Sequence, residues 1–183
     1  MSEKNTISRS LHDVGLSAWF GGTLANAVAL NQAAGQSGQQ GGAGAVANAG
    51  WDRWTPVNAA AIGAHLVGSV GQLIGNKDRL LAQRGVGTMA LVKTGLTVAA
   101  LGVTGYSRVL GGRISAHRAV PVADGTTPSA ATPPEVASAQ KQLAILQWAV
   151  PALTGALVVV SSYAGEQQRS NSVLQGLTKR IAG

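Results

Sequence analysis

Two apolar runs separated by a short charged break, all within residues 55–110, most constrain what this chain can fold into. The first run is TPVNAAAIGAHLVGSVGQLIG, the break is NKDRLLAQR, and the second run is GVGTMALVKTGLTVAALGVTGYSRVL. A helix of about twenty apolar residues, rising about 1.5 Å per residue, matches the hydrocarbon layer of a bilayer, which is about 30 Å thick. Because the break is short, the pattern predicts two transmembrane helices that are antiparallel neighbours.

The composition extends this prediction to the whole chain. Charged residues make up only 11% of the 183 residues, against about 25% in an ordinary soluble domain. So few charges would leave the surface of a soluble fold uncovered, whereas the 25 glycines suit close-packed membrane helices. We therefore expect an all-α polytopic membrane protein, a single domain over 1–183 with four transmembrane helices in an antiparallel bundle. Their expected positions are about 11–34, 56–75, 86–110 and 138–165.

The segments between the apolar runs predict loops and an orientation. Residues 35–50 are rich in Gly, Gln and Ala without any charge, which is typical of a flexible loop. Residues 111–137 hold four of the six prolines and predict an external Pro/Thr-rich linker with a poorly ordered middle. Residues 166–183 predict a basic cytoplasmic tail. Lys and Arg number eight on the side of the two termini and five on the other, which favours a plasma-membrane protein with both termini cytoplasmic.

Aromatic residues mark the ends of the central hairpin. Trp51 and Trp54 directly precede Thr55 and Pro56, a pair typical of the N-cap and first position of a helix. Tryptophan and tyrosine gather where a membrane meets water. The sequence therefore predicts a helix start at residue 56, with Trp51, Trp54 and Tyr106 as interfacial anchors.

Small residues spaced four apart predict where helices pack. Gly21 and Ala25 share one face of the first expected helix, and Gly71 and Gly75 share one face of the second, on which Gly68 also contributes a small position. Small residues let helix backbones approach closely in a membrane. We expect these faces to pack within one bundle, with dimerisation through Gly71 and Gly75 as the alternative.

Ionisable and amide side chains inside the apolar runs are the candidate functional residues. On the expected topology Lys93 lies about 10 Å and His65 about 15 Å from the inner end of the bundle, with Asp13 at the inner edge and Asn26 in the first helix. Because burying such groups in a membrane is costly, they form a candidate intramembrane polar site. Alternatively, Lys93 reaches the interface along its own stem. In that case His65 is neutral and bonded to an amide of Asn26, Asn58 or Gln72.

Catalytic and metal-binding patterns are sparse. The chain contains no cysteine, no hydrolase or transferase motif and no paired carboxylates, so we expect no enzyme and no metal site. The Lys and Arg residues are not clustered as a nucleic-acid-binding fold requires, so we expect no nucleic-acid partner. His12 and His65 could instead be axial ligands of a haem or part of a copper site. Their expected depths differ by about 15 Å, which argues against a shared metal.

Three blocks carry a resemblance to known sequences: LHDVGLSAWFGGTLANAVALN, WDRWTPVNAAAIGAHLVG and KTGLTVAALGVTGYSRVLG. Together they resemble uncharacterised actinobacterial four-helix integral membrane proteins. That resemblance implies a membrane bundle and brings no activity or functional residues with it. A weaker likeness to four-helix membrane proteins of the copper-resistance type lacks a copper-binding cluster in this chain.

The sequence thus leads to two functional hypotheses. The first is a non-enzymatic accessory or scaffold subunit that contacts the lipid bilayer and packs against other membrane subunits or itself through Gly and Ala faces. The alternative is a membrane protein for small-molecule or proton transport, or for haem binding, that uses His65 and Lys93. A third reading, a soluble or surface-bound protein, follows from a mean hydropathy of only +0.17.

Overall fold

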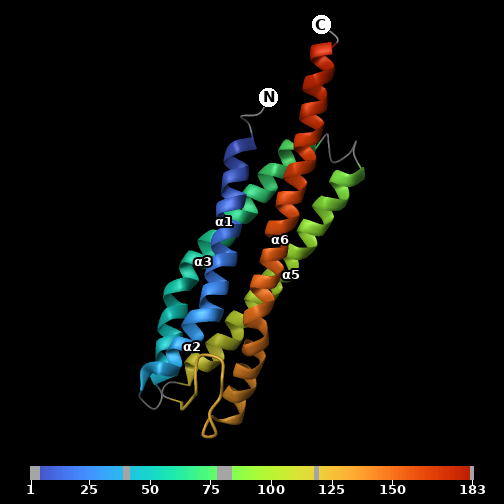
Figure 1. The fold of residues 1–183 in the computed structure, drawn as a ribbon. Coiled ribbons are helices and arrows are strands. Elements are labelled where there is room, and N and C mark those ends of the chain that lie inside the picture. Colours follow the sequence, from blue (N-terminus) through green and yellow to red (C-terminus); the bar gives the residue numbers. More distant parts are fainter. Residues whose placement is uncertain (1–4, 39–41, 78–83, 118–119, 182–183) are drawn as a thin grey trace.

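Antiparallel helices make up the structure (Figure 1). The computed structural model describes residues 5–38, 42–77, 84–117 and 120–181. The helices alternate in direction, so that both chain ends lie at the same end of the bundle. A π-helical turn, Asn26–Leu30, and a 3-10 turn, Gly35–Ser37, flank the short α2. The α-helices are α1 (Thr6–Ala25), α2 (Asn31–Ala34), α3 (Gly42–Gly75), α5 (Arg84–Ala116) and α6 (Pro134–Ile181). The predicted all-helical bundle is confirmed.

Three segments are long and apolar enough to cross a membrane: Gly42–Gly75 in α3, Gly87–Ala116 in α5 and Pro134–Gly165 in α6. Among the described residues α1 does not meet this criterion, because its N-terminal part carries the polar residues Ser8, Arg9, His12, Asp13 and Ser17. Large apolar side chains point outward on all four long helices, which fits contact with lipid. The fold therefore fits a multi-pass membrane protein.

The helices associate as two pairs, and this corrects the predicted hairpin. α1 packs along α3, α5 packs along α6, and α1 joins the pairs by contacting α6, whereas α3 and α5 barely touch. The short link between them, whose residues 78–83 lie outside the described residues, makes them consecutive and antiparallel. It does not make them packing neighbours, because the small-residue face of α3 is already occupied by α1.

Glycines set the close approach of α1 to α3. A Cβ atom added at Gly68 would lie 2.3 Å from the His12 backbone N, and one added at Gly71 would lie 2.2 Å from Ser8 Oγ. At the end of the bundle, Gly75 lies in the same way against the Asn5 side chain. Gly68, Gly71 and Gly75 therefore all lie in the contact with α1, as expected of packing positions.

The expected packing face at Gly21 and Ala25 lies elsewhere. Both residues are exposed, and a Cβ at Gly21 would meet no atom within 4 Å. It is the next residue, Gly22, that faces α3, because a Cβ there would overlap the Trp54 indole. The prediction that Gly21 and Ala25 pack within the bundle is wrong, since α1 contacts α3 through a face rotated by one residue.

The second long helix begins earlier than the sequence suggested. α3 starts at Gly42, so the expected loop over 35–50 is partly helical and Pro56 lies inside a helix. Alanines at positions 43, 45, 47 and 49 favour helix and outweigh the Thr-Pro start signal. The Thr55 hydroxyl bonds back to the Trp51 carbonyl oxygen at 2.8 Å instead of capping a new helix.

The Pro/Thr-rich connection is more ordered than its composition suggested. Its first part, up to Ala116, extends α5, and residues 120–133 form a folded loop at the end of the bundle opposite the chain ends (Figure 1). Val122 and Pro128 form an isolated antiparallel bridge. Asp124 Oδ1 accepts the backbone N–H groups of Thr126 and Thr127, each at 2.7 Å. Local turn chemistry therefore orders a segment that the proline content marked as disordered.

The C-terminal helix is longer than predicted. α6 continues from Pro134 to Ile181, so the expected tail over 166–183 is helical as far as Ile181 and extends beyond the other helices (Figure 1). Residues 182 and 183, like the N-terminal residues 1–4, lie outside the described residues. The expected fourth helix over 138–165 is the central part of this longer element.

Candidate functional site

A polar cavity of about 590 Å³ lies at the end of the bundle that carries both chain ends (Figure 1). It occupies the space where α3 and α5 fail to pack, and all four long helices line it. From Asn76 near its mouth to Leu66 it extends over ten positions of α3, about 15 Å. Its charged and aromatic polar lining residues are Arg9, His12, Asp13 and Lys93.

His12 and Asp13 form a hydrogen-bonded pair on α1. His12 Nδ1 lies 2.8 Å from Asp13 Oδ1. The His12 side chain is 1% exposed and that of Asp13 is 57% exposed, so the pair leads from the cavity mouth into the interior. Arg9, one turn earlier, lies 3.9 Å from Asp13 through its Nε. Asp13 is therefore shared between a buried imidazole and an exposed guanidinium.

His65 on α3 lies between the His12–Asp13 pair of α1 and a hydroxyl of α5. Its ring centroid lies 4.6 Å from that of His12 and 6.0 Å from that of Trp19. Its Nε2 lies 3.3 Å from the Thr97 hydroxyl on α5. The expected amide partners of His65 (Asn26, Asn58 and Gln72) make no hydrogen bond to it in the described residues. The hydroxyl of Thr97 takes that place.

The expected depth difference between His12 and His65 is wrong. The prediction placed His12 at the edge of a helix beginning near residue 11. α1 begins at Thr6 instead, with Asn5 level with Gly75, so His12 lies two turns inside the bundle. The fully buried His65 then meets His12 across the α1–α3 contact. Their proximity is the feature that sequence reasoning missed.

Lys93 lies on the α5 wall of the cavity. It is half-buried, and no carboxylate of the described residues lies within ion-pair distance of its amino group. It shares the cavity with Asp13, as the candidate site predicted, without pairing directly with it. Asn26, the fourth predicted residue, does not line the cavity. It lies eleven residues beyond Gly15, the α1 residue that packs against His65. The structure therefore brings together three of the four predicted site residues.

Beneath the cavity the bundle is closed by an apolar plug. Trp19, Ala61, Ala100 and Val150 form a buried cluster contributed by the four long helices. The Trp19 side chain is fully buried, and it also touches His65. The cavity therefore ends at this cluster toward the middle of the bundle, and its exposed lining residues Val70 and Val98 show that it is also open along the side between α3 and α5.

The expected interfacial anchors make specific contacts within the protein. Trp51 Nε1 donates to Asn31 Oδ1 at 3.0 Å, and Trp54 is half-buried against Gly22. The Tyr106 hydroxyl, on the exposed side of α5, donates to Gln142 Oε1. These residues join elements at the closed half of the bundle, away from the cavity.

The geometry does not suit a haem between the two histidines. Rings whose centroids lie 4.6 Å apart are in contact and leave no space for a porphyrin between them. Within the described residues there is also no group of three or more His, Asp or Glu side chains arranged for a metal ion.

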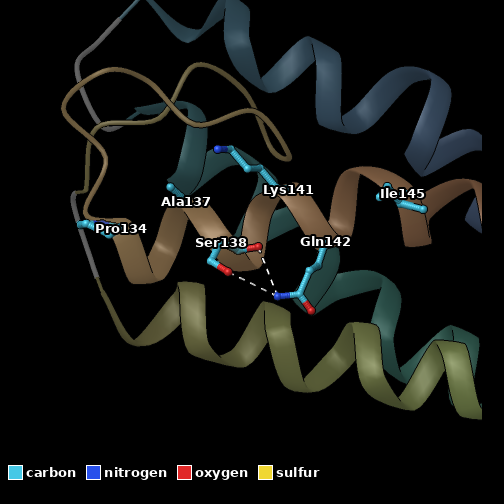
Figure 2. Close-up of a pocket in the computed structure, with 6 residues that line it drawn as sticks. All are labelled: Pro134, Ala137, Ser138, Lys141, Gln142 and Ile145. Atoms are coloured by element: carbon cyan, nitrogen blue, oxygen red, sulfur yellow. Dashed lines mark hydrogen bonds between the residues drawn. The ribbon is translucent and has the colours of Figure 1, made fainter.

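A second hollow lies on the surface at the start of α6 (Figure 2). Figure 2 shows that its walls come from successive turns of this single helix, with Gln142 bonded back to Ser138. A hollow on one helix brings no groups together from different elements, so it is a weaker candidate than the cavity. Its lining residues are Pro134, Ala137, Ser138, Lys141, Gln142 and Ile145.

Comparisons with protein-family models, with curated proteins and with solved structures found no match for this chain.

Proposed function

We propose that this chain is a four-pass plasma-membrane protein that transports protons or a small polar solute through the cavity of α1, α3, α5 and α6. The observation that carries the proposal is that His12, Asp13 and Lys93, from α1 and α5, line one cavity. His65 of α3 is not among the lining residues but is buried against the His12 ring. Ionisable groups inside a membrane bundle commonly mark solute and proton pathways. The apolar plug at Trp19 supports an alternating gate, because it closes the far side.

A non-enzymatic protein is part of this proposal. Every residue that lines the cavity lies on a helix or at a helix end, where most backbone N–H groups are used within the helix. The lining positions inside the helices therefore offer few of the free backbone donors that stabilise a developing oxyanion in acyl transfer. Thr97, whose hydroxyl lies beside His65, is one of these positions within α5.

The proposal also includes α1 as the fourth transmembrane helix and an orientation of the bundle in the membrane. α1 lies along α3 from Asn5 beside Gly75 to Leu30 beside Gly50, which supports a membrane-crossing pass shielded by its neighbours. Lys and Arg residues number eight at the end of the two termini and five at the other, which supports both termini in the cytoplasm. On this orientation the cavity opens to the cytoplasm.

Replacing Lys93 tests the transport proposal. In proteoliposomes loaded with a pH-sensitive dye, we expect Lys93→Met to reduce proton flux to the level of empty liposomes, because the one lysine that lines the cavity among the described residues is removed. Lys141→Met, which removes an exposed lysine on α6, should leave the flux unchanged. Equal flux through the two variants would show that Lys93 serves only to reach the interface.

A second candidate function, an accessory or scaffold subunit, is favoured by the outer face of α5. Only 6% of the apolar window of Gly87–Ala116 is buried. Seven exposed residues recur there in a heptad pattern, and added Cβ atoms at its glycines would meet nothing within 4 Å. A smooth heptad face of this kind fits another membrane helix. Its residues are Leu91, Gly95, Val98, Gly102, Gly105, Val109 and Gly112.

Gly102→Trp tests this second candidate. A bulky side chain at the centre of the α5 face should displace a packed helix, so we expect loss of co-purifying subunits or of a homo-oligomer in mild detergent. Ala156→Trp, at an exposed position on α6, is the matched control. The accessory-subunit proposal is rejected if the wild-type protein proves monomeric and without partners, or if its assembly survives Gly102→Trp.

A further inference from the structure

Hydrogen-bond donors from three helices line the cavity without acceptors. Lys93 on α5 has no carboxylate within ion-pair distance in the described residues. Gln72 Nε2 on α3 and Ser161 Oγ on α6 are buried and have no hydrogen-bond partner. Because leaving buried polar groups unpaired destabilises the protein, a ligand with several acceptor oxygens would be stabilised here.

The charge balance of the lining favours an anion. Arg9 and Lys93 contribute two positive charges, against one negative charge on Asp13. Asp13 is already occupied, since its carboxylate bonds to His12 Nδ1 and lies near Arg9 Nε. No titratable residue of α6 lines the cavity within the described part of the chain. The cavity therefore offers an unbalanced cation, Lys93, on its α5 wall.

His12 adds one acceptor to this set of donors. The Asp13 carboxylate can only accept, so the proton of the neutral His12 ring belongs on Nδ1. Its Nε2 is then an acceptor, and it is buried without a partner. A ligand that satisfies all these groups needs ionised oxygens for the donors and one O–H group for His12. Phosphate groups that keep a proton have this combination, whereas sulfate and phosphodiesters at neutral pH do not.

We propose that this cavity binds a phosphate monoester or inorganic phosphate, with Lys93, Gln72 and Ser161 around its ionised oxygens and His12 Nε2 accepting from its protonated oxygen. The inference rests on the proposed function, of which it names the solute class. The cavity also has apolar walls, from Leu66, Val70 and Leu73 on α3 and from Met89 and Leu101 on α5. Those walls accommodate the remainder of an ester, so either a soluble molecule or a lipid headgroup can supply the phosphate.

Binding measurements on the full chain in mild detergent test this inference. Inorganic phosphate, sulfate and dimethyl phosphate are titrated by calorimetry, and vesicles of phosphatidylcholine containing phosphatidic acid or phosphatidylglycerol are compared by flotation. We expect binding of phosphate or of phosphatidic acid, and weaker binding of sulfate, dimethyl phosphate and phosphatidylglycerol. Binding of inorganic phosphate identifies a soluble source, and binding of phosphatidic acid alone identifies a headgroup. Either result supports the site.

Two substitutions test the separate roles of Lys93 and His12 in phosphate binding. Lys93→Met should weaken phosphate binding about tenfold or more, because a charge-assisted contact is lost, and Lys141→Met should not. His12→Asn keeps a donor toward Asp13 and removes the Nε2 acceptor, so it should abolish the preference for phosphate over sulfate while leaving sulfate binding unchanged.

Several outcomes would overturn the inference. Sulfate bound as tightly as phosphate by the wild-type protein would show that His12 takes no part. Absence of binding by every phosphate probe, with proton flux retained in proteoliposomes, would reject the phosphate site and leave the transport function standing. Absence of both binding and flux would reject the two together.

Discussion

Gly68→Ala should separate α1 from α3 and destabilise the whole bundle. The new Cβ would lie 2.3 Å from the His12 backbone N and 2.5 Å from the Ser8 backbone oxygen. Backbone atoms cannot rotate away as a flexible side chain can, so the two helices must move apart. Such overpacking costs about 1–3 kcal/mol, which for a chain of 183 residues lowers the melting temperature in detergent by about 2–12 °C. Because His12 and His65 meet beside this contact, the variant should also lose proton flux.

Gly63→Ala is the matched control on the same helix. A Cβ at Gly63 would meet no atom within 4 Å, so the change should leave the bundle intact and slightly favour helix, by up to about 1 kcal/mol. Melting curves of the two variants, followed by circular dichroism, give the comparison. Equal melting temperatures would mean that α1 does not approach α3 as closely as described.

Asn31→Leu should weaken the packing of α2 against α3 and α6 at the end of the bundle opposite the chain ends. The Asn31 side chain donates to Gln147 Oε1 at 2.8 Å and accepts from Trp51 Nε1 at 3.0 Å, so it joins α2 to α6 and to α3. It is 2% exposed, and its backbone oxygen accepts from Gly125 of the folded loop. Removing the amide leaves two buried groups unpaired, at about 1–3 kcal/mol each. We expect a lower melting temperature and faster protease cleavage within residues 120–133.

Gln32→Leu is the control for that experiment. Gln32 is the next residue in α2, is exposed, and its side chain makes no hydrogen bond in the described part of the chain. Its replacement should change neither the melting temperature nor the cleavage pattern. If Asn31→Leu behaves like Gln32→Leu, the amide network does not hold the loop in place.

The helical bundle was predictable from apolar runs, whereas helix boundaries and pairing were not. Thr55 and Pro56 carry a strong start signal, yet the alanines before them extend α3 to Gly42. The short link after Gly75 suggested that α3 packs against α5, but packing follows the small-residue faces. The informative pattern on α1 is a heptad of small and polar residues that faces α3. Its members are Asn5, Ser8, His12, Gly15, Trp19 and Gly22.

The candidate site was predictable as residue types in a membrane, and its assembly was not. The cost of burying His65 and Lys93 marked them, and Asp13 shares the cavity with Lys93. The pairing of His12 with His65 depends on where α1 begins, which no local signal fixed to within two turns. Gln72 and Ser161 joined the site only in three dimensions, since each is a common residue on its own helix.

The division of the bundle into two pairs has a consequence for how the protein is made. A chain synthesised from its N-terminus completes both members of the α1–α3 pair before any residue of α5 is made. α5, in contrast, is inserted without its main packing surface and must wait for α6, across the whole of residues 117–133. Its smooth, weakly polar outer face is therefore the surface most open to engagement by another membrane helix during biogenesis.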